Sequence, residues 1–93
     1  SMEGVGLYYF MGYYTSYFAQ LPEEGKAEAI SQLLGLLEGS TKDYVRLGAF
    51  QSLLSFTEEP GVLESLKKAA EQERQEDLKN YFSYFLELYE EEN

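Results

Sequence analysis

The chain has 93 residues, of which 44% are hydrophobic and 26% charged, so it can form one modest hydrophobic core and has the composition of a globular domain. It contains no cysteine and no histidine, which excludes disulfides, thiolate and imidazole metal sites, and catalysis by either residue. Seven basic against seventeen acidic residues leave a formal charge of −10, which opposes binding to nucleic acids and to anionic membranes.

The first predicted element covers residues 5–18, which are apolar or aromatic on nearly all sides and predict the most enclosed helix of the domain. The segment is too short for a membrane-spanning helix, which needs about 20 residues. It is also rich in tyrosine, a residue enriched at protein interfaces because its side chain is large, stiff and amphipathic. A candidate interface therefore comprises Tyr8, Tyr9, Tyr13, Tyr14 and Tyr17. The alternative is that these tyrosines line the rim of the core with their hydroxyls in water.

A second helix is predicted to begin at Pro22, because proline suits the first helical position. Apolar residues then recur at steps of three and four as far as Leu37, which is the spacing of one helix face. Gly39 is expected to end this helix in the left-handed conformation. Ser40 and Asp43 match the S-x-x-[DE] capping pattern and predict the start of a third helix, which continues to about Phe56.

Pro60 marks the next predicted helix start, and apolar residues at helical spacing continue from Val62 to Tyr89. One uninterrupted helix from Pro60 to Tyr89 would measure roughly 45 Å. Twice the radius of gyration expected of a compact domain of this size is only about 24 Å, so a break is expected in the polar run 71–77. The sequence thus predicts one all-α domain over residues 3–91, with about five helices arranged as antiparallel hairpins.

An internal repeat supports that break. Shifting the chain by about 33 residues against itself places Leu33 on Leu66 and Val45 on Leu78, and it places the 39–41 turn on residues 72–74. Self-similarity at this period is typical of helical-hairpin repeats. Chance remains the alternative, because any two amphipathic helix pairs joined by short loops match somewhere.

A short helix, a turn with Asp43, and then Val45-Arg46 opening a second helix resemble a HEAT-like repeat, and residues 62–86 are a looser copy. This resemblance implies a right-handed superhelix of about 2.5 hairpins. The stretch 43–54 is also similar to the C-terminal helical domains of gluzincin-type zinc aminopeptidases. That similarity implies a fragment of a longer chain. The family's His-Glu-x-x-His zinc motif is absent, so no catalytic residue can be carried over.

Carboxylates are the only plentiful reactive groups, but neighbouring pairs such as Glu23–Glu24 point about 100° apart on a helix and do not converge. We therefore expect no catalytic, cofactor-binding or metal-binding residue in this chain. The leading hypothesis is a non-catalytic scaffold that packs against other domains of a larger protein, such as a zinc aminopeptidase. The alternative is an autonomous domain that binds a protein or peptide on an aromatic face. Partners would be proteins, neither nucleic acid nor a membrane interior, and the isolated chain is expected to self-associate.

Overall fold

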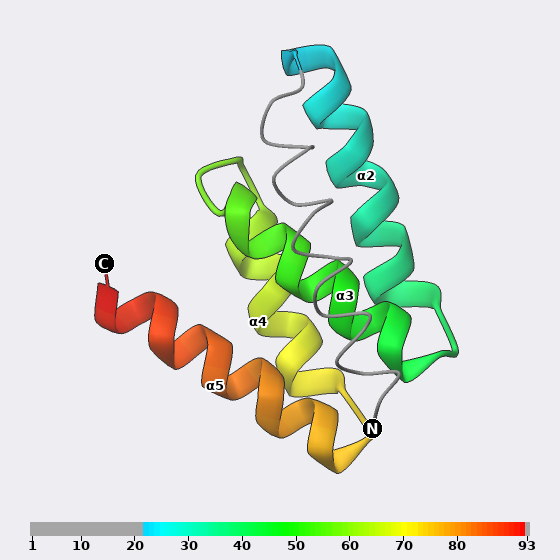
Figure 1. Cartoon of the computed structure of the whole chain (residues 1–93), viewed down its shortest axis with the longest axis vertical. Coiled ribbons are helices and arrows are strands. Elements are labelled where there is room, and N and C mark those ends of the chain that lie inside the picture. The colour runs from blue at the N-terminus through cyan, green and yellow to red at the C-terminus, as the bar shows by residue number, and fades with distance from the viewer. Residues whose placement is uncertain (1–21, 93) are drawn as a thin grey trace.

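A computed structural model describes residues 22–92, which form four α-helices and one 3-10 turn (Figure 1). The elements are α2 (Glu23–Gly39), α3 (Asp43–Leu53), η1 (Leu54–Phe56), α4 (Val62–Gln72) and α5 (Glu76–Glu92). No strand occurs within these residues, so the all-α prediction is confirmed for them. They contain four helices where about five were expected of the whole chain. The helix predicted over residues 5–18 falls outside the described residues.

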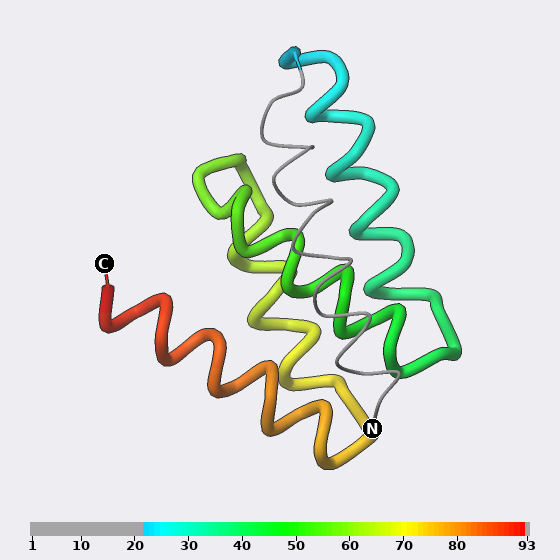
Figure 2. The backbone as a smooth tube through the Cα atoms, in the orientation of Figure 1, coloured from blue at the N-terminus to red at the C-terminus, as the bar shows by residue number. Residues whose placement is uncertain are grey.

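The helices form two successive hairpins, in which α2 packs along α3 and α4 packs along α5. Figure 2 shows the chain reversing direction at the short turn that joins the two helices of each hairpin. The hairpins meet where α3 contacts α5, and α4 also contacts both α2 and α3. The predicted break in the polar run 71–77 is confirmed, because α4 ends at Gln72 and α5 begins at Glu76.

A single apolar cluster joins all four helices, because each contributes one stripe of apolar side chains to the same interior. Its centre is a pair of phenylalanine rings from different hairpins. Phe50 of α3 and Phe82 of α5 are both fully buried, and their rings stack with centroids 4.1 Å apart and planes 6° from parallel. The remaining buried members of the cluster are Leu33, Leu37, Ala49, Leu53, Phe56, Val62, Leu66, Ala70 and Leu78.

Two helix ends of the first hairpin differ from the predictions. Gly39 does not close α2 in the left-handed conformation; it is the last helical residue, and the chain leaves through extended Ser40 with φ −72°. The predicted capping box is also wrong, because α3 begins at Asp43 and Lys42 is its N-cap residue. Ser40 lies two residues too early to cap α3, and its Oγ accepts a hydrogen bond from the Lys42 N–H at 3.2 Å instead.

The predicted starts at the two prolines are displaced as well. Pro22 precedes α2 as its N-cap residue, and α4 begins at Val62, two residues after Pro60. The N-cap of α4 is Gly61, whose φ of +83° lies in the left-handed region that glycine adopts without steric cost. Within residues 22–92 no other residue has a positive φ. The proline signals therefore locate the helices correctly but not their first residues.

Candidate functional site

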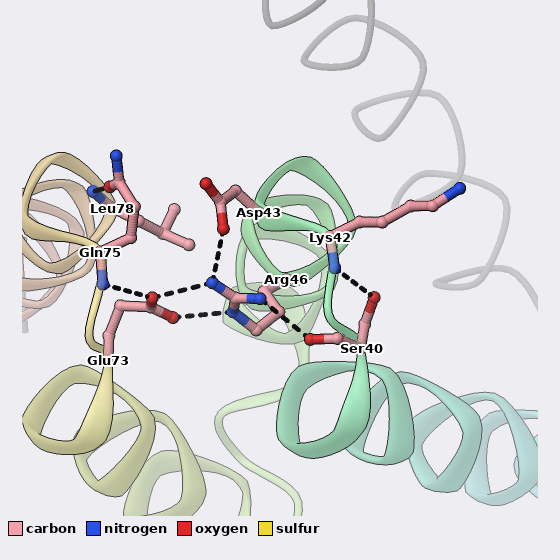
Figure 3. A network of polar contacts seen from close by, with 7 residues as sticks. All are labelled: Ser40, Lys42, Asp43, Arg46, Glu73, Gln75 and Leu78. Atoms are coloured by element: carbon pink, nitrogen blue, oxygen red, sulfur yellow. Dashed lines mark hydrogen bonds and ion pairs between the residues drawn. The ribbon is translucent and has the colours of Figure 1, made fainter.

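The most connected polar group in the described structure is the guanidinium of Arg46, on the first turn of α3 (Figure 3). Its Nε and Nη2 donate hydrogen bonds to the two carboxylate oxygens of Glu73, at 2.8 and 2.9 Å. Nη2 also donates to Asp43 at 2.7 Å, and Nη1 donates to the backbone carbonyl of Ser40 at 2.9 Å. One side chain therefore joins the end of α2, the start of α3 and the turn between α4 and α5.

The pair formed by Arg46 and Glu73 is shielded from water, since their side chains are only 16% and 5% exposed. The hydrogen bonds from Arg46 hold the pKa of the Glu73 carboxylate below its ordinary value of 4.5, although burial acts in the opposite direction. The backbone N–H of Gln75 donates to the same carboxylate at 3.0 Å and also favours its ionised form. The bidentate geometry is the one in which an arginine–carboxylate pair is strongest.

The two hairpin turns have the same local hydrogen bonds, which explains why they place Ser40 and Glu73 in corresponding positions. The N–H of Ser40 donates to the Leu36 carbonyl at 3.0 Å, and that of Glu73 donates to the Ala69 carbonyl at 2.9 Å. In each turn the side chain of that residue then accepts a hydrogen bond from the N–H two positions later. Such local side-chain bonds compete with helical pairing and favour a turn.

A shallow pocket lies beside Arg46, between the two turns and the ends of α2 and α4. Lys68 and Arg74 also line it, together with Ser40, Thr41 and Ser65. The cations there are partly offset by the carboxylates of Glu38 and Glu73, and Arg46 already uses its three nitrogens in the contacts above. The contacts that Arg46 makes beside the pocket are those of an ion pair that joins the two turns.

A second exposed feature is an aromatic surface on α5. Tyr81 and Tyr84 are each 54% exposed, and Leu88 is 38% exposed one turn further along. A shallow pocket lined by Asp77, Asn80 and the two tyrosines opens between them. Large exposed rings that are not part of a core are the side chains from which protein interfaces are built.

The predicted interface residues Tyr8, Tyr9, Tyr13, Tyr14 and Tyr17 lie outside the described residues, so that prediction stays untested. Nothing in the sequence marks Arg46 as the centre of a network. A lone Val-Arg pair marks a helix start, but only the fold shows that Glu73, 27 residues away, faces it. Of the aromatic residues on α5, Phe82 is buried and Phe85 half-buried, whereas Tyr81 and Tyr84 point outward.

Among residues 22–92, no group of three or more acidic residues is placed to hold a metal ion, and no helix is long and apolar enough to cross a membrane. The comparisons with protein-family models, with curated proteins and with solved structures find no significant match to the chain. The HEAT-like and aminopeptidase resemblances stay predictions from the sequence.

Proposed function

We propose that the chain is a non-catalytic scaffold built from stacked HEAT-like helical hairpins, which packs against other parts of a larger protein or against a protein partner. The observation that carries this proposal is the Arg46 network. Arg46 bonds the backbone of Ser40 in its own turn and the side chain of Glu73 at the corresponding position of the next turn. A single contact thus links equivalent points of two successive hairpins.

The helix ends support a repeat of thirty-three residues. α2 ends at Gly39 and α4 at Gln72, while α3 begins at Asp43 and α5 at Glu76, so both turns have the same length and the same spacing. A repeat unit of this size is one supersecondary element that cannot bury its apolar face alone and must stack on a neighbour. The first helices of the two hairpins, α2 and α4, contact each other, and so do the second helices, α3 and α5.

Burial follows the same period. In four pairs of the described residues that are separated by one repeat both members are buried, three pairs on the first helices of the hairpins and one on the second helices, as expected if the hairpins present similar faces to one core. Phe50 departs from this period, because Ser83 one repeat later is exposed. The pairs in which both members are buried are Ala29 and Val62, Leu33 and Leu66, Leu37 and Ala70, and Ala49 and Phe82.

A double-mutant cycle on Arg46 and Glu73 tests the stacking. Arg46→Met leaves a shielded carboxylate without its cation and is expected to lower the free energy of unfolding by about 3 kcal/mol. With Glu73→Gln, the cycle is expected to give a coupling energy of about 1–3 kcal/mol. Lys67→Ala is the matched control, because the exposed Lys67–Glu90 pair at 3.9 Å is expected to contribute less than about 1 kcal/mol. A coupling energy near zero would contradict the proposal.

Amide hydrogen exchange on the same variants asks whether the two hairpins behave as one body. If they do, the core amides of α3 and α5 share one opening free energy, and Arg46→Met lowers it equally in both. Loss of protection in one hairpin alone would contradict a rigid stack. Steady turnover of amino-acid p-nitroanilides by the purified chain would contradict the non-catalytic part of the proposal.

The gene sequence tests whether the chain is part of a larger protein. Codons that continue in frame upstream of Glu3 are expected, and a His-Glu-x-x-His sequence among them would support the aminopeptidase resemblance. A native start codon at this point would favour the second candidate, an autonomous interaction domain. That candidate is supported by the exposed tyrosines of α5.

A further inference from the structure

The exposed apolar residues of α5 form one stripe along the helix. Tyr81, Tyr84 and Leu88 are spaced by three and four residues, which places them on one side over about two turns. The polar contacts between α5 and α4 lie elsewhere: Lys79 reaches the Glu71 carbonyl, and Glu90 pairs with Lys67. At 100° per residue, Tyr81 is about 160–180° around the helix from Lys79 and Glu90. The stripe therefore faces away from α4.

The stripe is also distinct from the surface on which a further hairpin would stack. In the first hairpin, Arg46 and Phe50 make a polar contact and a ring contact to the second hairpin. One repeat later, these positions are occupied by Lys79 and Ser83, which are both exposed and polar. Stacking through the positions that correspond to Arg46 and Phe50 therefore does not involve Tyr81, Tyr84 or Leu88.

The two tyrosine rings pack against the half-buried side chain of Phe85. Both pack around Phe85, with centroid distances of 6.2 Å for Tyr81 and 5.9 Å for Tyr84. Phe85 in turn packs on the buried ring of Phe50 at 6.3 Å. A platform that is ordered before binding loses little side-chain entropy when a partner docks, which favours affinity.

Charge indicates the kind of partner. Asp77 lies one turn before Tyr81 and lines the same shallow pocket, and Glu91 lies two turns after Tyr84. Aromatic faces flanked by carboxylates attract lysine and arginine through cation–π and charge–charge interactions. A second copy of the chain would bring a charge of −10 and the same acidic residues to this surface, so like charges would oppose its docking.

We propose that the Tyr81–Tyr84–Leu88 stripe of α5 binds a basic amphipathic helix of another protein, whose apolar side chains cover the stripe and whose lysines or arginines meet Asp77 and Glu91. This mode of recognition uses apolar anchors at helical spacing together with complementary charges at the rim. The proposal rests on the proposed function of a binding scaffold and adds the surface and the chemistry of its partner.

The test is a fluorescence-anisotropy titration of the full chain with a labelled peptide of roughly 16 residues that has leucines on one helical face and lysines beside them. A peptide with glutamates in place of the lysines is the matched control. We expect saturable binding of the basic peptide alone, and weakening by at least about tenfold in the double variant Tyr81→Ser and Tyr84→Ser. Tyr44→Ser, which removes an exposed tyrosine from α3, is expected to leave binding unchanged.

Glu91→Lys provides a second variant that cannot disturb the core, because residue 91 is exposed in the last turn of α5. It is expected to weaken binding of the basic peptide by about threefold. Equal binding of the acidic peptide, or unchanged affinity in the tyrosine double variant, would overturn the proposal. The Arg46–Glu73 cycle needs no peptide, so failure of the stack and failure of the peptide site are read from separate experiments.

Discussion

At the scale of single residues, Arg46 shows how a charged side chain is accommodated at the junction of two hairpins. Its three nitrogens all have acceptors, and its carboxylate partner Glu73 also receives the Gln75 N–H. Burying a charge costs free energy unless the charge is paired and hydrogen-bonded, and here both conditions are met. The network specifies which turn lies beside which, in addition to any stability that it contributes.

The lowered pKa of Glu73 predicts a pH dependence of stability. Because the pKa of this carboxylate is lower in the folded state, its stabilising contribution is complete above 4.5 and is lost as the pH falls through the folded value. Arg46, whose pKa is raised by the same pairing, stays protonated throughout. Urea unfolding between about pH 6 and about pH 3 is expected to show the stability difference between the native chain and Glu73→Gln shrinking with acidification. A constant difference would contradict the assignment.

Ser52 is a position at which a substitution is expected to stabilise the fold. Its hydroxyl on α3 is fully buried and has no hydrogen-bond partner in the described part of the chain. Removing an unsatisfied buried hydroxyl relieves a desolvation cost, so Ser52→Ala is expected to raise the free energy of unfolding by about 1 kcal/mol. Ser83→Ala on the exposed face of α5 is the control and changes helix propensity alone, by about 0.5 kcal/mol. Thermal unfolding that shows Ser52→Ala to be destabilised would refute this.

At the scale of elements, the turn between α4 and α5 explains why the two helices are separate. Gln75 precedes α5, and its side-chain oxygen accepts a hydrogen bond from the Leu78 N–H at 2.6 Å. This contact satisfies one of the backbone donors that every helix leaves free in its first turn. Glu76 and Asp77 add negative charge at the same helix end, where the helix dipole favours it.

Gln75→Ala is therefore expected to lower the free energy of unfolding by about 1 kcal/mol, as loss of a helix cap does. Thr41→Ala in the other turn is the control, because Thr41 is exposed and α3 has no side-chain cap to lose. Urea denaturation followed by circular dichroism measures both. Equal stabilities of the two variants would show that the Gln75 cap does not hold the start of α5.

How far the elements could be predicted depended on whether their signals were local. Apolar spacing identified most of the buried helix positions, because a buried helix face has an apolar residue at every third or fourth position. The cap at Gln75 and the start of α4 at Val62 were missed. Glutamine is a weak predictor of helix caps. In the Pro60-Gly61 pair the glycine is the N-cap residue, so α4 begins at Val62 and not at the proline.

At the scale of the whole molecule, the two hairpins share one interior whose centre is the stacked pair Phe50 and Phe82. Each ring comes from the second helix of its hairpin, so the stack holds the hairpins together. Removal of either ring leaves a cavity that both hairpins line. The stability of each hairpin is therefore expected to depend on the other.

Phe82→Ala is expected to lower the free energy of unfolding by about 3–5 kcal/mol, a large part of the stability of a small domain. Tyr84→Ala, two residues along the same helix and half exposed, is the control and is expected to cost less than about 0.5 kcal/mol. The measurement is urea unfolding monitored by circular dichroism. Similar losses for the two variants would contradict a shared core centred on Phe82.

By itself, the amino-acid sequence determined the helical class of residues 22–92, most of the apolar positions that face the core and the break between α4 and α5, because spacing, turn residues and polar runs act over a few residues. Only the tertiary structure decided that Arg46 meets Glu73 and that Phe50 stacks on Phe82. It also decided that Tyr81 and Tyr84 stay exposed while Phe82 is enclosed. These outcomes depend on how one hairpin is placed on the next, and that placement is set by the shape of both surfaces together.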